Sequence, residues 1–107
     1  MGGISWHRRA KAIPEAVIVR WTLRASADLR RLHDFLEAKN PQAAKAVAET
    51  LANAPSKLRQ FPRRGPRVEG FEGREVRRLV VGSYEIRYEI AGEVIRILQI
   101  WHGKEDR

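Results

Sequence analysis

The dipeptide Gly82-Ser83 constrains the fold more than any other feature, because it separates two runs with the alternating polarity of β-strands. Glycine at the first central position of a two-residue hairpin suits a type II′ turn, and such a turn fixes which residues of the two strands lie opposite each other. Val81 is therefore predicted to pair with Tyr84. Counting outward predicts three further pairs: Leu79 with Ile86, Arg77 with Tyr88, and Glu75 with Ile90.

The predicted register gives the two faces of this hairpin different polarity. The residues just paired form one face, which is apolar until its far end. The opposite face is expected to be mostly exposed to solvent, and it carries Val76, Arg78, Val80, Glu85, Arg87 and Glu89.

A second two-residue turn is predicted at Ala91-Gly92, which also lies between two strand-like runs. Counted in the same way, this turn places Ile95 beside Tyr88 and Ile97 beside Ile86. The C-terminal part of the chain is therefore expected to form a meander of three antiparallel strands, over residues 74–81, 84–90 and 93–101.

The N-terminal part predicts one strand followed by two helices. Residues 16–22 form a β-branched and aromatic run of strand length. Ser26 is expected to cap the first helix, with Asp28 complementing the positive helix end in the first turn, and the helix is expected to end near Lys39. Its apolar stripe consists of Leu29, Leu32, Phe35 and Leu36.

The second helix is predicted to begin at Asn40-Pro41, because asparagine caps helices and proline at the first helical position loses no hydrogen bond that the helix needs. The short connection makes the two helices an antiparallel hairpin. Pro55 lacks the amide that would bond to Leu51, so a distortion is predicted around residues 54–56. The apolar stripe of this helix consists of Ala44, Val47, Ala48, Leu51, Leu58 and Phe61.

Together these elements predict an α+β domain of two layers, with an N-terminal strand, an antiparallel two-helix hairpin and a three-stranded antiparallel meander whose apolar face the helices cover. The domain is expected to span residues 16–107. Residues 1–15 lack hydrophobic periodicity and are expected to be a flexible N-terminal extension. Residues 61–73 are rich in proline, glycine and arginine and are expected to form a mobile basic loop.

Composition limits the chemistry that is open to this chain of 107 residues, which has no cysteine and a formal net charge of +8. Disulfides, thiolate metal sites and cysteine nucleophiles are excluded, and His7, His33 and His102 are not at ligand spacing, so we expect no metal and no other cofactor. The N-terminal residues show no continuous apolar stretch, so we expect a cytoplasmic protein with no membrane partner. The charge favours a polyanionic partner, which could be nucleic acid, the ribosome or an acidic protein.

Several short motifs follow one another in a specific order between residues 17 and 107. The first half contains Trp21, Ala25-Ser26-Ala27-Asp28-Leu29, Asn40-Pro41-Gln42-Ala43-Ala44, Leu58, Phe61-Pro62 and Arg64-Gly65. The second half contains Arg77-Arg78-Leu79, the run from Val81 to Ile90, Ile97-Leu98 and the run from His102 to Arg107. Their order and spacing resemble the RelE/ParE toxin superfamily, and its ParE branch in particular. The chain departs from the pattern at residues 1–15, which have no counterpart, and at Pro55, where such toxins commonly continue a helix.

The resemblance implies the toxin of a type II toxin–antitoxin system, which inhibits bacterial growth and is neutralised by a cognate acidic antitoxin. The antitoxin is expected to wrap the toxin with its C-terminal segment and to bind operator DNA with its other end, so operator DNA is a partner only through the antitoxin. For a ParE-like member of the superfamily the implied target is DNA gyrase. For a RelE-like member it is messenger RNA on the ribosome. The closing residues 103–107 resemble the ParE tail, which favours a gyrase inhibitor without catalytic residues.

The alternative is a ribosome-dependent mRNA endonuclease. Cleavage through the 2′-hydroxyl needs a base, an acid and a cation that stabilises the phosphorane. His102 or Glu75 could move protons, and Arg77, paired with Tyr88, could hold phosphate. A structural interpretation is at least as good, with Tyr88 in the core, Arg77 paired with Glu75, and His102 hydrogen-bonded at a strand end. A plain nucleic-acid-binding module is less favoured, because the aromatic residues fall on core-facing strand positions.

Two binding surfaces are also predicted. The target would contact the basic loop and the C-terminal tail through Arg63, Arg64, Arg67, Lys104 and Arg107. The other interpretation of the loop is that its charge serves only solubility. An antitoxin segment that enters a groove or adds a strand to the sheet would cover apolar side chains, and we expect these to be Leu29, Leu32, Phe35, Val76, Val80, Leu98 and Ile100.

Overall fold

A computed structural model describes residues 17–103, in which one strand and two helices precede three further strands. The elements are β1 (Ile18–Trp21), α2 (Leu23–Glu37), α3 (Pro41–Asn53), the 3-10 helix η2 (Ala54–Arg59), β2 (Glu75–Val81), β3 (Tyr84–Ala91) and β4 (Val94–His102). The predicted α+β class is confirmed. The extension predicted over residues 1–15, together with Lys104 and Arg107, lies outside the described residues.

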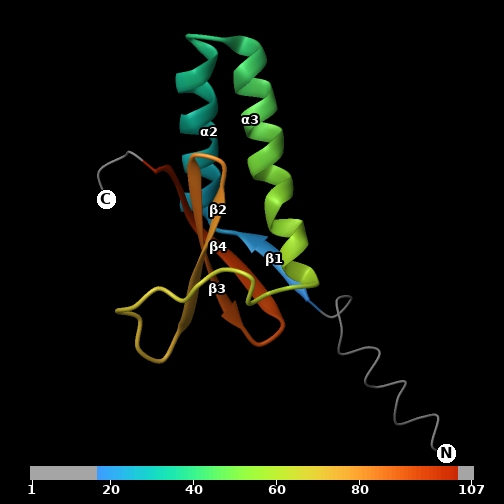
Figure 1. Cartoon of the computed structure of the whole chain (residues 1–107), viewed down its shortest axis with the longest axis vertical. Coiled ribbons are helices and arrows are strands. Elements are labelled where there is room, and N and C mark those ends of the chain that lie inside the picture. The colour runs from blue at the N-terminus through green and yellow to red at the C-terminus, as the bar shows by residue number, and fades with distance from the viewer. Residues whose placement is uncertain (1–16, 104–107) are drawn as a thin grey trace, which may run out of the picture.

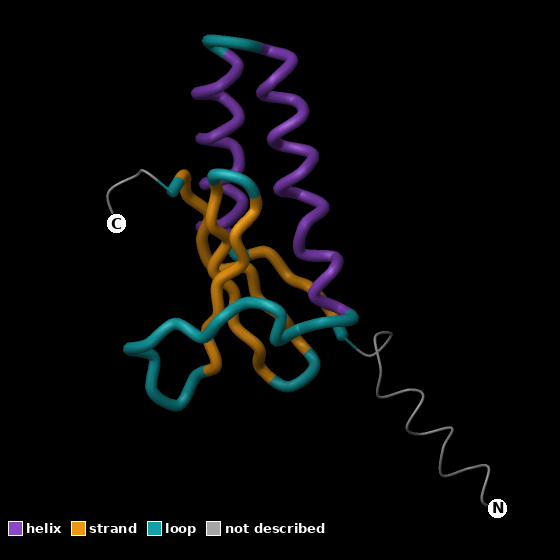
Figure 2. The backbone as a smooth tube through the Cα atoms, viewed as in Figure 1, coloured by secondary structure: helices purple, strands orange, loops and turns teal. Residues whose placement is uncertain are grey.

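The four strands form a single sheet in the order β1-β4-β3-β2. β2, β3 and β4 are the predicted antiparallel meander, and β1 is an edge strand parallel to β4. α2 and α3 form the predicted hairpin, and the ends at which they are joined project beyond the strands (Figure 1). The loop between η2 and β2 runs across the sheet near the opposite end (Figure 2). Within residues 17–103, no helix has both the length and the apolar character needed to cross a bilayer.

The first hairpin has the predicted register. Val81 pairs with Tyr84, and the three pairs predicted beyond them are also formed, as far as Glu75 with Ile90. Gly82 has a φ of 59°, whereas Ser83 has no positive φ, which is the combination that a type II′ turn requires. The turn therefore fixes the position of every side chain of β2 relative to β3.

The second turn lies one residue later than predicted, at Gly92-Glu93, because Ala91 pairs with Val94. Gly92 has a φ of 63° and so takes the first central position, the same position that glycine takes in the first turn. The predicted partner of Tyr88 was therefore wrong by two residues, since Tyr88 pairs with Ile97. The predicted partner of Ile86 was wrong by three residues, since Ile86 pairs with Ile100. A shift of two residues keeps a side chain on its predicted face, whereas the third residue moves Ile100 to the core face.

Helix α2 is attached to β4 at a bulge. The register of β4 shifts between its pairings with Arg87 and Tyr88, which leaves Leu98 without a partner of its own. Thr22 donates its hydroxyl to the Ile97 carbonyl at 2.8 Å, and Asp28 accepts a hydrogen bond from the Ile100 amide at 3.0 Å. The Ile97 carbonyl and the Ile100 amide of β4 are thus bonded to the start of α2.

The predicted start of α2 was wrong. Thr22, not Ser26, caps the helix, and its hydroxyl oxygen accepts from the Ala25 amide at 3.0 Å. Asp28 consequently lies in the second turn, where it is buried rather than placed at the helix end. Thr22 is the better cap because its hydroxyl serves both elements, accepting from the Ala25 amide of α2 and donating to the Ile97 carbonyl of β4.

The second helix follows the prediction more closely. Asn40 caps α3 by accepting from the Ala43 amide at 3.2 Å, and Pro41 occupies the first turn. Regular α-helix ends at Asn53, and a 3-10 helix that contains Pro55 follows. Pro55 and Leu58 are buried there, so the break that proline causes directs the chain onto the sheet.

The core lies between the helices and the apolar face of the sheet. Its fully or nearly buried members are Ala25, Leu32, Leu51, Leu58, Leu79, Ile86, Tyr88, Ile95, Ile97 and Ile100. Residues from every element except β1 take part, and Val19 and Trp21 of β1 pack against its edge. The sheet and both helices therefore depend on one continuous apolar cluster.

The opposite face of the sheet is less exposed than predicted. Val76 is fully buried, and Glu85 and Glu89 retain 6% and 8% exposure, whereas Val80 is 64% exposed. The guanidinium carbon of Arg87 lies 4.7 Å from the centre of the Trp101 ring and 5.8 Å from that of Phe71. The loop that precedes β2 and Trp101 of β4 thus cover this face, an arrangement that alternation within a single hairpin cannot predict.

Replacing Asp28 with alanine tests the junction between α2 and β4. The Ile100 amide would lose its partner inside the protein, so we expect the free energy of unfolding to fall by about 1–3 kcal/mol in urea denaturation. Asp34→Ala is the matched control, since the Asp34 side chain is 66% exposed, and its effect is expected to stay within about 0.5 kcal/mol. Equal losses in the two variants would contradict the role given to the junction.

Candidate functional site

The hydroxyl of Tyr88 fastens the basic loop to the sheet. It donates to the Pro62 carbonyl at 2.7 Å and accepts from the Gly65 amide at 3.2 Å. The side chain has no exposed surface, and this burial raises the pKa of Tyr88, so the phenol keeps its proton and can donate. A residue predicted both as a catalytic candidate and as a core aromatic therefore holds loop backbone.

The loop lies directly against β2. A Cβ atom on Gly65 would stand 1.8 Å from the carbonyl oxygen of Arg78, so only glycine fits there without a shift of the backbone. The Arg78 amide donates to the Pro66 carbonyl at 3.1 Å, and the Val68 amide donates to the Val76 carbonyl at 2.8 Å. The loop that was expected to be mobile is thus hydrogen-bonded along the edge of the sheet.

Three of the four catalytic candidates lie together beneath this loop. Glu75 accepts from Arg77 at 2.8 Å and from Arg63 at 2.9 Å, and Arg77 also donates to the Gly65 carbonyl at 2.8 Å. Burial raises the pKa of Glu75, but the hydrogen bonds and charges of the two arginines outweigh it and leave the pKa below the ordinary value. The geometry matches the structural interpretation, in which Arg77 is salt-bridged to Glu75.

His102 does not join these residues. It pairs with Tyr84, and the two rings meet edge to face with 5.1 Å between their centres. Tyr84 and Tyr88 are four residues apart on β3, which corresponds to roughly 13 Å along the strand. His102, the proposed proton donor or acceptor, therefore lies opposite one end of β3. Arg77, which was proposed to hold phosphate, pairs with β3 farther along the strand.

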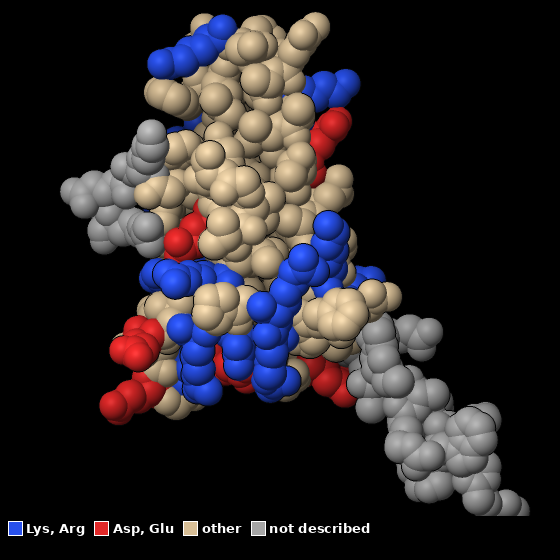
Figure 3. Space-filling view, viewed as in Figure 1, with Lys and Arg blue, Asp and Glu red and all other residues tan. Residues whose placement is uncertain are grey.

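A group of exposed cations surrounds the fastened loop, and we call it the basic surface. It consists of Lys57, Arg64, Arg67 and Arg78, which have no ion-pair partner among the described residues. Figure 3 shows lysine and arginine side chains gathered across the loop and the neighbouring strands. Arg64 and Arg67 were predicted target contacts, whereas Lys57 and Arg78 were not, because the sequence does not tell where the loop lies relative to β2 and η2.

A groove separates the α3–η2 segment from the end of β2 next to the first turn. Two adjoining hollows of about 210 and 300 Å³ share Thr50 and Val81 as lining residues. Their walls are largely apolar, and Lys57 and Arg64 of the basic surface line the larger hollow. The other lining residues are Ala46, Val47, Leu51, Asn53, Ala54, Leu79, Val80, Gly82, Ser83 and Tyr84.

The predicted antitoxin contacts divide into accessible and inaccessible side chains. Val80 and Phe35 are 64% and 59% exposed, and Leu29 and Leu98 are partly buried. Leu32, Val76 and Ile100 lie in the interior, with at most 5% exposure, so the expectation of exposure at Val76 and Ile100 was wrong. The bulge at Leu98 and the loop over β2 explain why strand alternation misplaced them.

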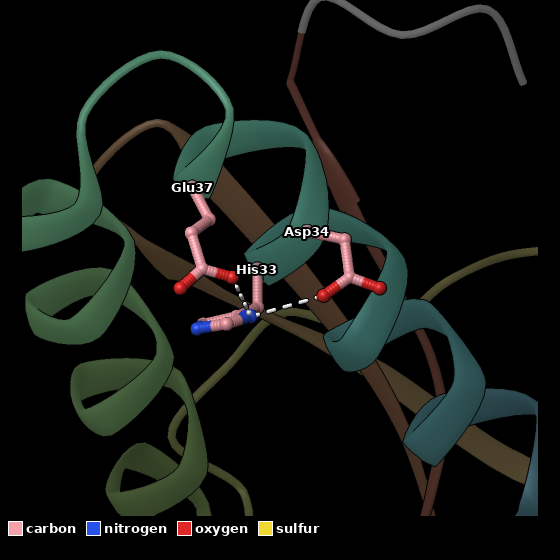
Figure 4. Close-up of side chains that lie close together, drawn as sticks. All are labelled: His33, Asp34 and Glu37. Carbon is pink, nitrogen blue, oxygen red and sulfur yellow. Dashed lines mark hydrogen bonds and ion pairs between the residues drawn. The ribbon is translucent and has the colours of Figure 1, made fainter.

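His33, Asp34 and Glu37 form a separate polar group on α2 (Figure 4). The Nδ1 atom of His33 lies 3.1 Å from an Asp34 oxygen and 3.9 Å from a Glu37 oxygen. The three potential ligand atoms lie within 4.8 Å of one another. All three residues come from one stretch of helix, and contacts of His33 with its neighbour Asp34 and with Glu37 one turn later account for the same distances.

Comparison with known proteins identifies the family. Residues 19–107 match the model of the ParE toxin of type II toxin–antitoxin systems. The chain belongs to the ParE toxin family. The toxin is 38% identical over 85 residues to Toxin RelE2 of Caulobacter vibrioides, an alignment that covers 79% of this chain and 93% of the relative. It is 32% identical over 90 residues to Toxin RelE1 of the same species, which covers 80% and 92%.

Solved structures of toxin–antitoxin complexes share the fold. The toxin aligns with a chain of the chromosomal ParDE system of Pseudomonas aeruginosa at a TM-score of 0.69 and 24% identity, covering 80% of this chain and 95% of that one. It aligns with the RelE–RelB complex of Pyrococcus horikoshii at a TM-score of 0.61 and 17% identity, covering 85% and 99%. The family match and the curated relatives make this chain a type II toxin of the ParE/RelE family. The structural alignments show that it has the fold of the chains it matches.

Replacing Tyr88 with phenylalanine tests how the loop is held. The variant keeps the ring in the core but leaves the Gly65 amide and the Pro62 carbonyl without their partner, so we expect a loss of about 1–3 kcal/mol in the free energy of unfolding. Hydrogen exchange at the Gly65 amide is expected to accelerate. Tyr84→Phe is the control on the same strand, and comparable exchange in both variants would show that the Tyr88 hydroxyl does not hold the loop.

Proposed function

We propose that this toxin arrests growth by binding DNA gyrase and that it catalyses no reaction. The observation that supports the absence of catalysis is the separation of His102 from Arg77 and Tyr88 along β3. Glu75 and Arg77 are engaged in ion pairs, and Tyr88 has no exposed surface. Cleavage of RNA needs an acid, a base and a cation around one phosphate, and these residues are not arranged in that way.

Membership in the ParE family supports gyrase as the target, since the resemblance of the sequence to the ParE branch implies it. The contact surface in this proposal is the basic loop with Arg63, Arg64 and Arg67, together with Lys104 and Arg107 of the C-terminal tail. Messenger RNA cleavage on the ribosome is the second candidate. It is favoured by the names of the two curated relatives, both of which are RelE toxins.

The antitoxin is proposed to place an acidic, partly apolar segment in the groove between α3 and β2. Val80 is exposed at the edge strand β2, next to Lys57 and Arg64 in the larger hollow. Apolar side chains could cover Val80, carboxylates could pair with the two cations, and a strand could continue the sheet at its edge. The solved relatives are complexes of a toxin with its antitoxin, which supports a partner of this kind.

A supercoiling assay on purified gyrase, run beside primer extension on transcripts from cells that express the toxin without its antitoxin, tests the target. We expect supercoiling to stop while the transcripts stay intact. His102→Ala is expected to leave gyrase inhibition within about twofold of the native level, a difference of roughly 0.4 kcal/mol in binding. Transcripts cut at codon positions, with the cuts abolished by His102→Ala and by Arg77→Ala, would overturn the proposal and establish the second candidate.

Val80→Asp tests the antitoxin groove. An added carboxylate would repel an acidic segment and remove apolar contact, so we expect affinity for the antitoxin from the neighbouring gene to fall at least about tenfold, or 1.4 kcal/mol, by calorimetry. Leu23→Asp adds the same charge at a side chain that is 90% exposed and outside the groove, and it is expected to bind like the native toxin. Similar losses in both variants would place the antitoxin elsewhere.

A further inference from the structure

We infer that the basic surface of Lys57, Arg64, Arg67 and Arg78 binds the phosphate backbone of duplex DNA. The inference rests on the proposed function, because an inhibitor of gyrase meets its target on DNA. It deepens that function by naming duplex DNA as the part of the gyrase–DNA target that Arg64 and Arg67 of the contact surface meet. It also gives the toxin a DNA contact of its own, separate from operator binding through an antitoxin.

The positive charge of this region is distributed unevenly between paired and unpaired side chains. Arg63 and Arg77 share Glu75, and Arg74 forms a 2.9 Å ion pair with Glu89. The four cations of the basic surface are exposed and have no carboxylate partner among residues 17–103. Like charges gathered on one surface create a local potential that attracts a polyanion, and phosphates can neutralise them without the cost of burial.

The backbone beneath these side chains is held in place. The hydrogen bond from the Arg78 amide to the Pro66 carbonyl joins the strand that carries Arg78 to the loop that carries Arg64 and Arg67. Gly65, the neighbour of Arg64, packs on the Arg78 carbonyl. The backbone of Arg67 forms an isolated antiparallel β-bridge with that of Arg77. Cations on a fixed backbone lose less conformational entropy on binding than cations on a mobile loop, so the arrangement favours a surface prepared for a ligand.

Duplex DNA fits this surface better than a single strand does. Proteins that bind single strands stack bases on exposed aromatic rings. Tyr88 is buried, and Phe71 lies against the guanidinium groups of Arg74 and Arg87, which leaves Phe61, at 60% exposure, as the exposed aromatic side chain near the loop. One exposed ring cannot stack successive bases, so these cations suit the regular row of phosphates of a duplex, where contacts carry no sequence information.

The test uses fluorescence anisotropy of a short labelled duplex with the full-length toxin over a series of salt concentrations. The variant R64Q/R67Q/R78Q is compared with R20Q/R30Q/K45Q, which removes three exposed cations of β1, α2 and α3. Each variant lowers the formal net charge from +8 by three, to +5, so a general effect of charge would weaken both equally. Urea denaturation checks that both variants are folded.

We expect the basic-surface variant to lose affinity at least about tenfold and to reduce the slope of log affinity against log salt by roughly 2.7, or 0.9 for each lost phosphate contact. The control variant is expected to keep the native slope. Equal losses in the two variants, or tighter binding of a single-stranded RNA of the same length through the same residues, would overturn the inference.

The supercoiling assay separates this inference from the proposed function. If the native toxin inhibits gyrase but the basic-surface variant binds the duplex as well as the native toxin does, the inference fails and the proposed function stands. If the native toxin does not inhibit gyrase, the proposed function fails, whatever the anisotropy series gives.

Discussion

The hydroxyl of Tyr88 makes two hydrogen bonds in a place that solvent does not reach, and the position of the basic loop depends on them. The two bonds satisfy the Pro62 carbonyl, which is partly buried, and the Gly65 amide, which is buried. Gly65 allows the loop to approach because its missing side chain leaves room for the Arg78 carbonyl. Together with the backbone hydrogen bonds from Arg78 to Pro66 and from Val68 to Val76, this contact fixes the cations of the loop relative to those of β2.

The register of the first hairpin links that contact to the rest of the sheet. Because Val81 pairs with Tyr84, Arg77 lies opposite Tyr88 and its guanidinium reaches the Gly65 carbonyl under the loop. The separate pairing of β3 with β4 places His102 opposite Tyr84, at the other end of the strand. The first hairpin thus determines what is gathered beneath the loop, and the second keeps His102 away from it. This separation is the basis for proposing inhibition by binding rather than by catalysis.

Local signals in the sequence were sufficient where a residue's own backbone chemistry decides the outcome. Gly82 could be placed in its turn, Asn40 at its cap and Pro55 at the helix break, since each depends on φ, on a missing amide or on a nearby side-chain acceptor. The turn predicted at Ala91-Gly92 lies one residue later. Turns at Ala91-Gly92 and at Gly92-Glu93 fit the alternation of apolar and polar residues in the two strands equally well, so the pattern could not choose between them. The prediction of Ser26 as a cap failed because Thr22 has additional partners on β4.

The sequence by itself determined the order of the elements, the first hairpin, the apolar face and the excess of positive charge. Each of these follows from periodicity, turn chemistry or composition, which involve residues close together in the chain. Only the tertiary structure decided that β1 lies beside β4, that Asp28 bonds to a bulge, and that the basic loop lies on β2. These contacts join residues far apart in the chain, and their hydrogen bonds form only after the core has brought the layers together.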